Sequence, residues 1–169
     1  MENPKDYGFN SQLIHYSGHH DAFGAATVPI YQTSTFAFES AQDGADCFAG
    51  VKPGYMYTRI GNPTVKALER QVALLEHACD SVAVASGMAA VSTVYLGLLN
   101  AGDHVVSSSA VYGASRVLME QHMSRFGVES TYVNTANLDE VKAAMRPNTK
   151  MLYVETPANP TMEISDIAA

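Results

Sequence analysis

Short apolar stretches alternate with longer helical stretches from residue 62 onward, and this alternation limits the fold more than any other feature of the sequence. Apolar runs bounded by turn-forming residues predict strands at 81–86, 104–109, 129–134 and 150–155. Apolar spacing and helix-start signals predict helices at 62–75, 87–99, 112–126 and 137–145. Strands that alternate with helices of this length form parallel sheets with helices on both faces. The sequence therefore predicts an α/β fold.

Two of the expected helices carry clear start signals. Asn62 is a favoured cap residue, and Pro63 follows at the first helical position, where its missing N–H costs no hydrogen bond. Asn137 and Glu140 have the three-residue separation of a capping box, in front of a short helix that reaches Met145. These signals fix the beginnings of the first and last expected helices.

Residues 1–61 lack this regularity. They are rich in Gly, Pro, Thr and Tyr and contain one short helical patch at 40–48. A long stretch without periodicity is unusual inside a compact domain. We therefore expect residues 1–61 to be an N-terminal arm that packs on a neighbouring subunit. Residues 62–169 are expected to be the first part of the main domain.

The C-terminal residues indicate whether the expected domain is complete. Residues 164–169 have the pattern of a helix that has just begun. A sheet of parallel strands would in addition have unpaired edges. We expect the domain of residues 62–169 to be truncated.

The composition argues against several classes of partner. The 169 residues are 47% hydrophobic and 16% charged, which is typical of a globular protein. They carry 10 basic and 17 acidic side chains, a net charge of −7, without any basic block. This argues against nucleic acid and anionic membranes as partners. No apolar run approaches the roughly 18 residues of a membrane span, and no secretory signal core is present, so we expect a cytoplasmic protein.

The cysteines and histidines do not have the spacing of a metal site. Cys47 and Cys79 form no ligand-spaced pair, and we expect no disulfide between them. Cys79 follows an apolar helical stretch, so we expect a packed small side chain. His19 and His20 are adjacent and point to different faces, which favours a polar loop over metal binding.

Unusual residues follow three of the expected strands, at the edge where parallel sheets bind ligands. After the first, Gly87 allows a tight turn and leaves its own N–H and that of Met88 open to an anion, although a plain strand-to-helix turn fits the same pattern. After the second, Tyr112 has two interpretations. Its ring lies against a heteroaromatic ring with its hydroxyl toward a substrate, or it covers the edge of the core.

Two further segments fit either a ligand-binding role or an ordinary turn or loop. In Glu155-Thr-Pro-Ala-Asn-Pro160, two prolines flank Asn159 and hold its amide in one orientation, or the segment is an ordinary turn. In the run from Tyr55 to Pro63, Arg59 lies beside aromatic residues. This run is either a phosphate-binding fork or a surface loop.

Taken together, these segments resemble the Cys/Met-metabolism family of pyridoxal-phosphate (PLP) enzymes. The resemblance is carried by the runs at 54–64, 86–88, 112–113 and 155–160, with support from 7–10 and 29–36. It covers practically the whole chain and is greatest to the methionine γ-lyases, followed by the O-acetylhomoserine sulfhydrylases and the cystathionine γ-lyases. It implies an aspartate-aminotransferase-like α/β fold (fold type I) and a pyridoxal 5'-phosphate cofactor. The implied activity is γ-elimination of a sulfur amino acid to give a thiol, a 2-oxo acid and ammonia.

The resemblance also implies roles for single residues. Tyr57 and Arg59 would bind the cofactor phosphate of a neighbouring subunit, which would explain the arm. Gly87 and Met88 would donate backbone N–H groups to the phosphate within their own subunit. The implied assembly is a homotetramer, a dimer of dimers whose active sites are shared between subunits.

Three other residues would act near the cofactor ring. Tyr112 would stack on the pyridine ring and serve as an acid toward the leaving thiol. Asn159 would donate to the phenolic oxygen, and Glu155 would support the site from behind. One departure concerns Ala114, because methionine γ-lyases usually have cysteine at this position, which leaves the exact substrate open.

The resemblance further implies that the cofactor-bearing lysine lies beyond residue 169. None of the lysines present is expected at the carboxyl end of a strand, and we expect all five to be solvated. They are Lys5, Lys52, Lys66, Lys142 and Lys150.

Overall fold

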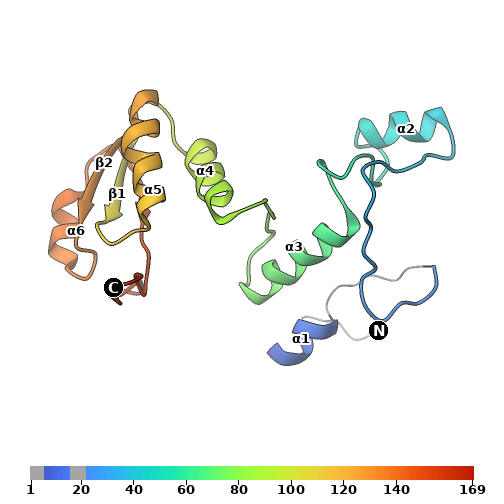
Figure 1. The fold of residues 1–169 in the computed structure, drawn as a ribbon, viewed down its shortest axis with the longest axis horizontal. Helices are drawn as coiled ribbons and strands as arrows, with labels where there is room; N and C mark the ends of the chain where they lie inside the picture. Colours follow the sequence, from blue (N-terminus) through green and yellow to red (C-terminus); the bar gives the residue numbers. More distant parts are fainter. Residues whose placement is uncertain (1–5, 16–21) are drawn as a thin grey trace. The chain divides into compact units, whose positions relative to one another are not determined.

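The computed structural model describes residues 6–15 and 22–169 of the chain (Figure 1). It consists of two compact units, residues 1–83 and 84–169. His19 and His20, expected in a polar loop, lie outside the described residues, as does Lys5. The division at residue 61 stays a prediction, as does the packing of the arm on a neighbouring subunit.

The first unit contains the helices α1 (Phe9–His15), α2 (Ala41–Phe48) and α3 (Pro63–Leu75). The helix expected near 40–48 is confirmed as α2, which Ser40 caps by accepting the Asp43 N–H. α1 packs against α3, and was not expected from the sequence. It lies in the segment 1–61, which therefore contains two helices among its described residues.

Asn62 caps α3 as expected and also anchors the preceding chain. Its Oδ1 accepts the Thr64 N–H at 2.9 Å, while its Nδ2 donates to the Tyr31 carbonyl at 2.9 Å. The Thr64 hydroxyl donates to the Pro29 carbonyl and accepts the Tyr31 N–H. Residues 29–31 are thereby attached to the first turn of α3, with Asn62 buried between them.

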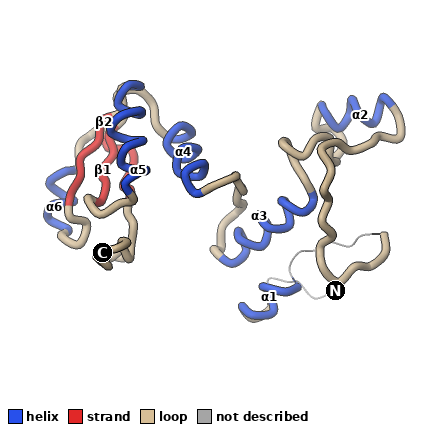
Figure 2. Tube along the Cα trace, viewed as in Figure 1, coloured by secondary structure: helices blue, strands red, loops and turns tan. Residues whose placement is uncertain are grey.

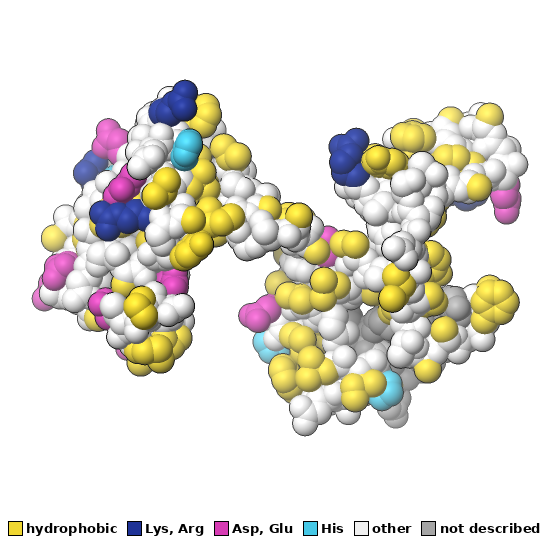
Figure 3. Space-filling model, viewed as in Figure 1, with side chains coloured by type: hydrophobic (Ala, Val, Ile, Leu, Met, Phe, Trp, Pro, Cys, Tyr) yellow, Lys and Arg dark blue, Asp and Glu magenta, His cyan; other side chains and the backbone are white. Residues whose placement is uncertain are grey.

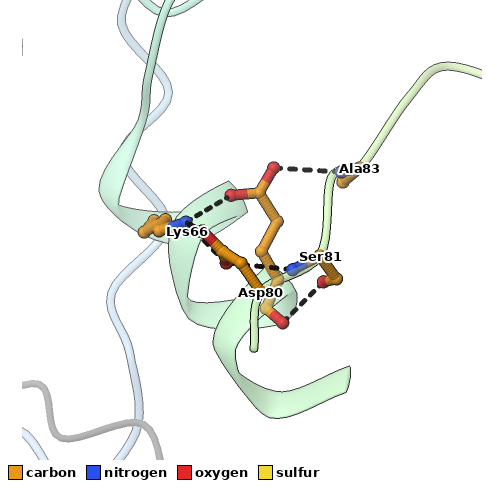
Figure 4. A network of polar contacts seen from close by, with 5 residues as sticks. Lys66, Asp80, Ser81 and Ala83 are labelled. Carbon is orange, nitrogen blue, oxygen red and sulfur yellow. Dashed lines mark hydrogen bonds and ion pairs between the residues drawn. The ribbon is translucent and has the colours of Figure 1, made fainter. Parts of the chain in front are cut away.

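The end of the first unit is held by a network of charged groups around α3 (Figure 4). Lys66 Nζ lies 3.0 Å from Asp80 Oδ1 and 3.3 Å from Glu69 Oε2. The Ser81 N–H donates to Asp80, and the Ala83 N–H donates to Glu69 Oε1 at 2.9 Å. Backbone donors beyond residue 80 thus bond to carboxylates.

The strand expected at 81–86 is wrong: this segment, which is fully described, forms no strand. A strand needs a neighbour for its N–H groups, and here two of them bond to carboxylates instead. Val82 is 78% exposed, so the apolar run is not buried either. The apolar pattern gave no information about a pairing partner.

The second unit contains a three-stranded parallel sheet with the order β2-β1-β3 (Figure 2). The strands are β1 (His104–Ser108), β2 (Glu129–Val133) and β3 (Thr149–Tyr153). In the register, Val106 lies opposite Thr131 and Leu152. β1 is buried along its whole length because it is the central strand. These three strands confirm three of the four that the alternating pattern predicts.

Helices cover both faces of this sheet. α4 (Gly87–Leu98) and the helical stretch after β1 contribute to a core around Val105, with Tyr95, Met119 and Met123 buried in it. α6 (Leu138–Ala144) lies on the other side, as Figure 1 shows. The predicted α/β architecture is confirmed.

The helical stretch expected at 112–126 has three parts. It consists of α5 (Gly113–Val117), a π-helical turn η2 (Leu118–His122) and a 3₁₀ turn η3 (Met123–Phe126). It ends at Gly127, whose φ of 80° is a conformation that favours glycine. An added Cβ there would also lie 3.2 Å from the Ala101 Cβ.

α6 begins as its capping pattern predicts. Asn137 Oδ1 accepts the Asp139 N–H, and Asn137 Nδ2 donates to Glu140 Oε1 at 3.0 Å. The second oxygen of Glu140 accepts the Asn134 N–H at 3.1 Å. One carboxylate therefore joins the end of β2 to the start of α6.

Both cysteines are free. The expectation that Cys79 is packed is wrong, because it lies in the exposed loop after α3 and not on the apolar side of that helix. Apolar side chains are also exposed on both units (Figure 3), and on α4 they include Leu96 and Leu98. Within the described parts of the chain, no helix combines the length and hydrophobicity needed to cross a membrane.

Candidate functional site

Tyr112 stands between the end of β1 and the start of α5. Tyr112 is 60% exposed as a residue, so it does not cover the edge of the core, which was one of the two interpretations. Its backbone N–H donates to Glu155 Oε2 at 2.8 Å. Glu155 follows β3 by two residues, so this bond joins the carboxyl ends of two neighbouring parallel strands.

The loop after β3 presents Asn159 at the same edge of the sheet. The Asn159 N–H lies 3.5 Å from Glu155 Oε1, the longer of the two contacts of this carboxylate. Ala158 is fully buried, and its N–H donates to the Glu163 carbonyl at 2.9 Å. The Asn159 side chain is exposed, which leaves its amide free to meet a ligand.

The start of α4 supplies unpaired donors. Ser86 caps the helix, with its Oγ accepting the Ala89 N–H at 3.1 Å. Among the described residues, the N–H groups of Gly87 and Met88 donate to no protein group. No atom lies within 4 Å of the position that a Cβ on Gly87 would take. Two N–H donors at the positive end of a 12-residue helix favour an anion.

Ser115 joins the start of this helix to α5, and sequence reasoning missed it. It is buried on α5, and its hydroxyl donates to the Met88 sulfur at 3.8 Å. Ser115 thus contacts Met88 at the start of α4, while Glu155 connects Tyr112 to Asn159.

Tyr57 and Arg59 belong to the first unit. Tyr57 forms an antiparallel bridge with Thr35, and the Arg59 guanidinium carbon lies 5.5 Å from the centre of the Tyr57 ring. Arg59 is exposed and makes no ion pair within the described residues. Both residues line an open depression of about 930 Å³ that also includes Thr33 and Ser34.

The four described lysines are divided between the two units, and within the second unit neither lysine lies at the carboxyl end of a strand. Lys52 pairs with Asp43, and Lys66 pairs with Asp80. The hydrogen bond to Asp43 raises the pKa of Lys52, and the bond to Asp80 raises that of Lys66, so both ammonium groups are stabilised in the charged form. A lysine that attacks a carbonyl must lose this charge. The other two are Lys142 on α6 and Lys150 near the start of β3.

A cavity of about 520 Å³ lies between α6, β3 and the last residues of the chain. Its walls include Leu138, Val141 and Leu152. None of the candidate residues lines it, so it does not belong to the site.

The family model of "Cys/Met metabolism PLP-dependent enzyme" matches residues 10–169. The chain belongs to this family. L-methionine gamma-lyase of Fusobacterium nucleatum subsp. polymorphum is 48% identical over 165 residues, which are 98% of this chain and 42% of that protein. Cystathionine gamma-lyase of Bacillus subtilis (strain 168) is 45% identical over 144 residues, 85% of this chain and 36% of that protein.

Solved structures agree. The metB protein of Corynebacterium glutamicum has a TM-score of 0.87 at 40% identity, over 98% of this chain and 42% of that one. A Campylobacter jejuni protein described as an O-acetylhomoserine (thiol)-lyase has a TM-score of 0.84 at 30% identity, over 99% of this chain and 40% of that one. That protein carries a pyridoxyl-lysine monophosphate. The present chain therefore has the fold type I architecture of PLP enzymes and spans about two fifths of these relatives' length.

The residues of the second unit fit the cofactor of this PLP-dependent family. A phosphate needs hydrogen-bond donors, and the start of α4 offers the free N–H groups of Gly87 and Met88. A pyridine ring needs an aromatic face, and the Tyr112 ring is exposed. A phenolic oxygen needs a donor, and the Asn159 amide is exposed in a loop that Glu155 joins to Tyr112.

Proposed function

We propose that the protein is a PLP-dependent carbon–sulfur lyase that removes the γ-substituent of L-methionine or a related sulfur amino acid. The products would be a thiol, a 2-oxo acid and ammonia. The observation that carries the proposal is the Glu155 carboxylate, which links exposed Tyr112 and exposed Asn159 at the carboxyl edge of a parallel sheet. The L-methionine gamma-lyase of Fusobacterium nucleatum, at 48% identity, supports the choice of substrate.

Backbone and side-chain donors would hold the cofactor at its phosphate. The N–H groups of Gly87 and Met88 would bind it within one subunit, with the dipole of α4 adding attraction. The Tyr57 hydroxyl and the Arg59 guanidinium would bind it from the neighbouring subunit. The proposed assembly is therefore a homotetramer, a dimer of dimers in which residues 1–61 form an arm that reaches the neighbouring site.

The Tyr112 ring would stack on the bound pyridine ring, and the Tyr112 hydroxyl would donate a proton to the departing sulfur atom. The Asn159 amide would donate to the phenolic oxygen. When bound, pyridoxal phosphate supplies an electron sink for the negative charge that develops at the α-carbon of the substrate. The protein holds the substrate in position and stabilises that charge by fixed donors.

Two related activities of the same enzyme family are alternatives. They are the replacement catalysed by O-acetylhomoserine sulfhydrylases and the elimination catalysed by cystathionine γ-lyases. Ala114, two residues after Tyr112, is the reason to test both alternatives, because methionine γ-lyases usually have cysteine at this position. The alternative outside enzymes is a catalytically incomplete chain that acts only by subunit association, and the placement of the four described lysines favours it for the 169 residues taken alone.

We also propose that the protein acts on small molecules in the cytoplasm, without a nucleic-acid or membrane partner. The net charge of −7 supports this because polyanions would repel the chain.

The function is tested by comparing substrates with the full-length protein loaded with PLP. L-methionine, cystathionine, and O-acetylhomoserine with sulfide are supplied separately, and thiol, 2-oxo acid and ammonia are measured. We expect equal amounts of the three products from L-methionine. Formation of homocysteine and acetate from O-acetylhomoserine and sulfide, without 2-oxo acid from any substrate, would identify a replacement enzyme. Absence of turnover, with no cofactor absorbance near about 420 nm, would favour the non-catalytic alternative.

A further inference from the structure

One carboxylate connects the two loops that present the candidate side chains. Glu155 Oε2 accepts the Tyr112 N–H at 2.8 Å, and Glu155 Oε1 faces the Asn159 N–H at 3.5 Å. Tyr112 precedes the first residue of α5, whose N-cap position has no side-chain hydrogen bond of its own. Glu155 thus takes the place of a capping side chain, from a different strand.

We infer that Glu155 is a positioning residue, which fixes the backbones of Tyr112 and Asn159 relative to each other and so sets the positions from which the two side chains project. The inference deepens the proposed function, on which it rests for the identity of the bound group. Hydrogen bonds from N–H groups to a carboxylate are shorter and stronger than those between neutral groups. The 2.8 Å bond to Tyr112 has the length expected of such a contact.

Other contacts hold the loop after β3 in place independently of Glu155. Ala158 is fully buried and held by the Glu163 carbonyl, while the Ser165 N–H donates to the Thr156 hydroxyl at 3.0 Å. The loop after β3 is therefore ordered by its own contacts. What Glu155 adds is the connection of that loop to the start of α5.

Glu140 provides a matched control in the same unit. Its two oxygens also accept from two loop groups beyond a parallel strand, the Asn134 N–H at 3.1 Å and Asn137 Nδ2 at 3.0 Å. No candidate site residue follows β2, however. Glu140→Ala therefore has a comparable structural effect without touching the site.

The first experiment follows amide hydrogen exchange in the full-length protein. Glu155→Ala should speed exchange at Tyr112 by about 10-fold or more, the effect of losing a hydrogen bond to a charged acceptor. Exchange at Asn159 should rise as well, by a smaller factor because its contact is longer. Glu155→Gln keeps an acceptor oxygen and should restore part of the protection. Glu140→Ala should leave both amides unchanged. Unchanged exchange at Tyr112 in Glu155→Ala overturns the inference.

The second experiment measures PLP binding by absorbance and turnover by product release. Glu155→Ala should lower kcat by about 10- to 100-fold with little change in KM, because small misplacements of reacting groups cost rate. It should also shift the absorbance of the bound cofactor, and Glu155→Gln should recover part of both effects. If Glu155→Ala and Glu140→Ala behave alike, the inference is wrong. If the unsubstituted protein binds no PLP, the proposed function fails, while the exchange result still decides whether Glu155 joins the two loops.

Discussion

Tyr112 is the residue on which the proposed chemistry most depends. Its backbone N–H is held by Glu155, whereas the residue as a whole is 60% exposed at the carboxyl edge of the sheet. A fixed backbone with an exposed ring is typical of a side chain that contacts a ligand, because core tyrosines bury the ring and satisfy the hydroxyl locally. The ring and the hydroxyl would have separate functions, stacking and proton donation.

Replacing Tyr112 by phenylalanine separates these functions. In the full-length enzyme, Tyr112→Phe should slow γ-elimination by about 10²- to 10⁴-fold, the usual contribution of one general acid. PLP affinity should barely change because the stacking ring is kept. Steady-state rates and equilibrium dialysis of PLP measure the two effects. Normal turnover in the variant would restrict Tyr112 to stacking.

His104 is a buried titratable residue that the proposed reaction does not use. Its Nδ1 lies 2.8 Å from Thr149 Oγ1 and its Nε2 lies 2.9 Å from Thr131 Oγ1. Burial, followed by the nearby Arg146 guanidinium, lowers the pKa of His104 below its ordinary value of 6.5, while Glu129 opposes the shift. As the pH falls below 6.5, His104 therefore binds a proton less readily in the folded state than in the unfolded state.

This difference predicts a pH dependence of stability. The free energy of unfolding should be fully maintained above pH 6.5 and should decrease as the pH falls below it, because the unfolded state then binds the extra proton. Urea unfolding at several pH values from about 5 to 8 measures the slope. His104→Gln, which cannot titrate, should show a shallower slope. Equal slopes in both proteins would assign the effect to other groups.

At the scale of helices and strands, caps were predictable and strand pairing was not. Asn62 and the Asn137–Glu140 pair mark helix starts because capping is local and depends on residues two or three positions apart. The segment 81–86 has the apolar pattern of a strand, yet two of its N–H groups bond to carboxylates. Pairing depends on residues far along the chain, and the local pattern does not contain them.

The site was predictable to a similar degree. Loop composition after the expected strands singled out Gly87, Tyr112 and Asn159 as candidates. All three lie in the second unit, but no strand precedes Gly87, and the roles of the three residues stay predictions. Ser115 was missed because a buried serine on a helix has no distinctive sequence signal. The bond from Tyr112 to Glu155 spans 43 positions, and neither propensity nor periodicity predicts such a contact.

The double role of Asn62 leads to a prediction for α3. Asn62→Ala removes the helix cap and also the bond to the Tyr31 carbonyl, from a side chain that is buried. It should therefore cost about 2–3 kcal/mol of unfolding free energy, more than a cap alone. Asn137→Ala removes an exposed cap of α6 and should cost about 1 kcal/mol. Urea unfolding measures the loss of unfolding free energy in each variant. An equal loss in both would show that the attachment of residues 29–31 to Asn62 does not stabilise the fold.

At the scale of the whole molecule, the proposed cofactor site combines groups from two subunits. Tyr57 and Arg59 belong to the first unit, and Arg59 is exposed without an ion pair among the described residues. An unpaired guanidinium next to an aromatic ring is suited to a phosphate. The free N–H groups of Gly87 and Met88 are suited to the same anion.

Removing the guanidinium should weaken cofactor retention. Arg59→Ala should raise the dissociation constant for PLP by about 10- to 150-fold, which corresponds to about 1.5–3 kcal/mol for a charge-assisted contact. Absorbance titration of the full-length protein measures it. Arg70→Ala, on α3 and outside the proposed site, is the control and should retain PLP like the unsubstituted protein. Equal affinities for Arg59→Ala and Arg70→Ala would remove Arg59 from the phosphate site.

Subunit mixing tests the shared site most directly. Full-length Arg59→Ala subunits are mixed in equal amounts with Tyr112→Phe subunits, and mixed dimers are demonstrated by mass spectrometry. If Arg59 serves the neighbouring site, half of the dimers are mixed and one of the two sites in each has both groups intact. The account then predicts recovery of about a quarter of the unsubstituted activity. If mixed dimers form and activity stays at the level of the separate variants, Arg59 and Tyr112 act within one chain, and the proposed shared site is contradicted.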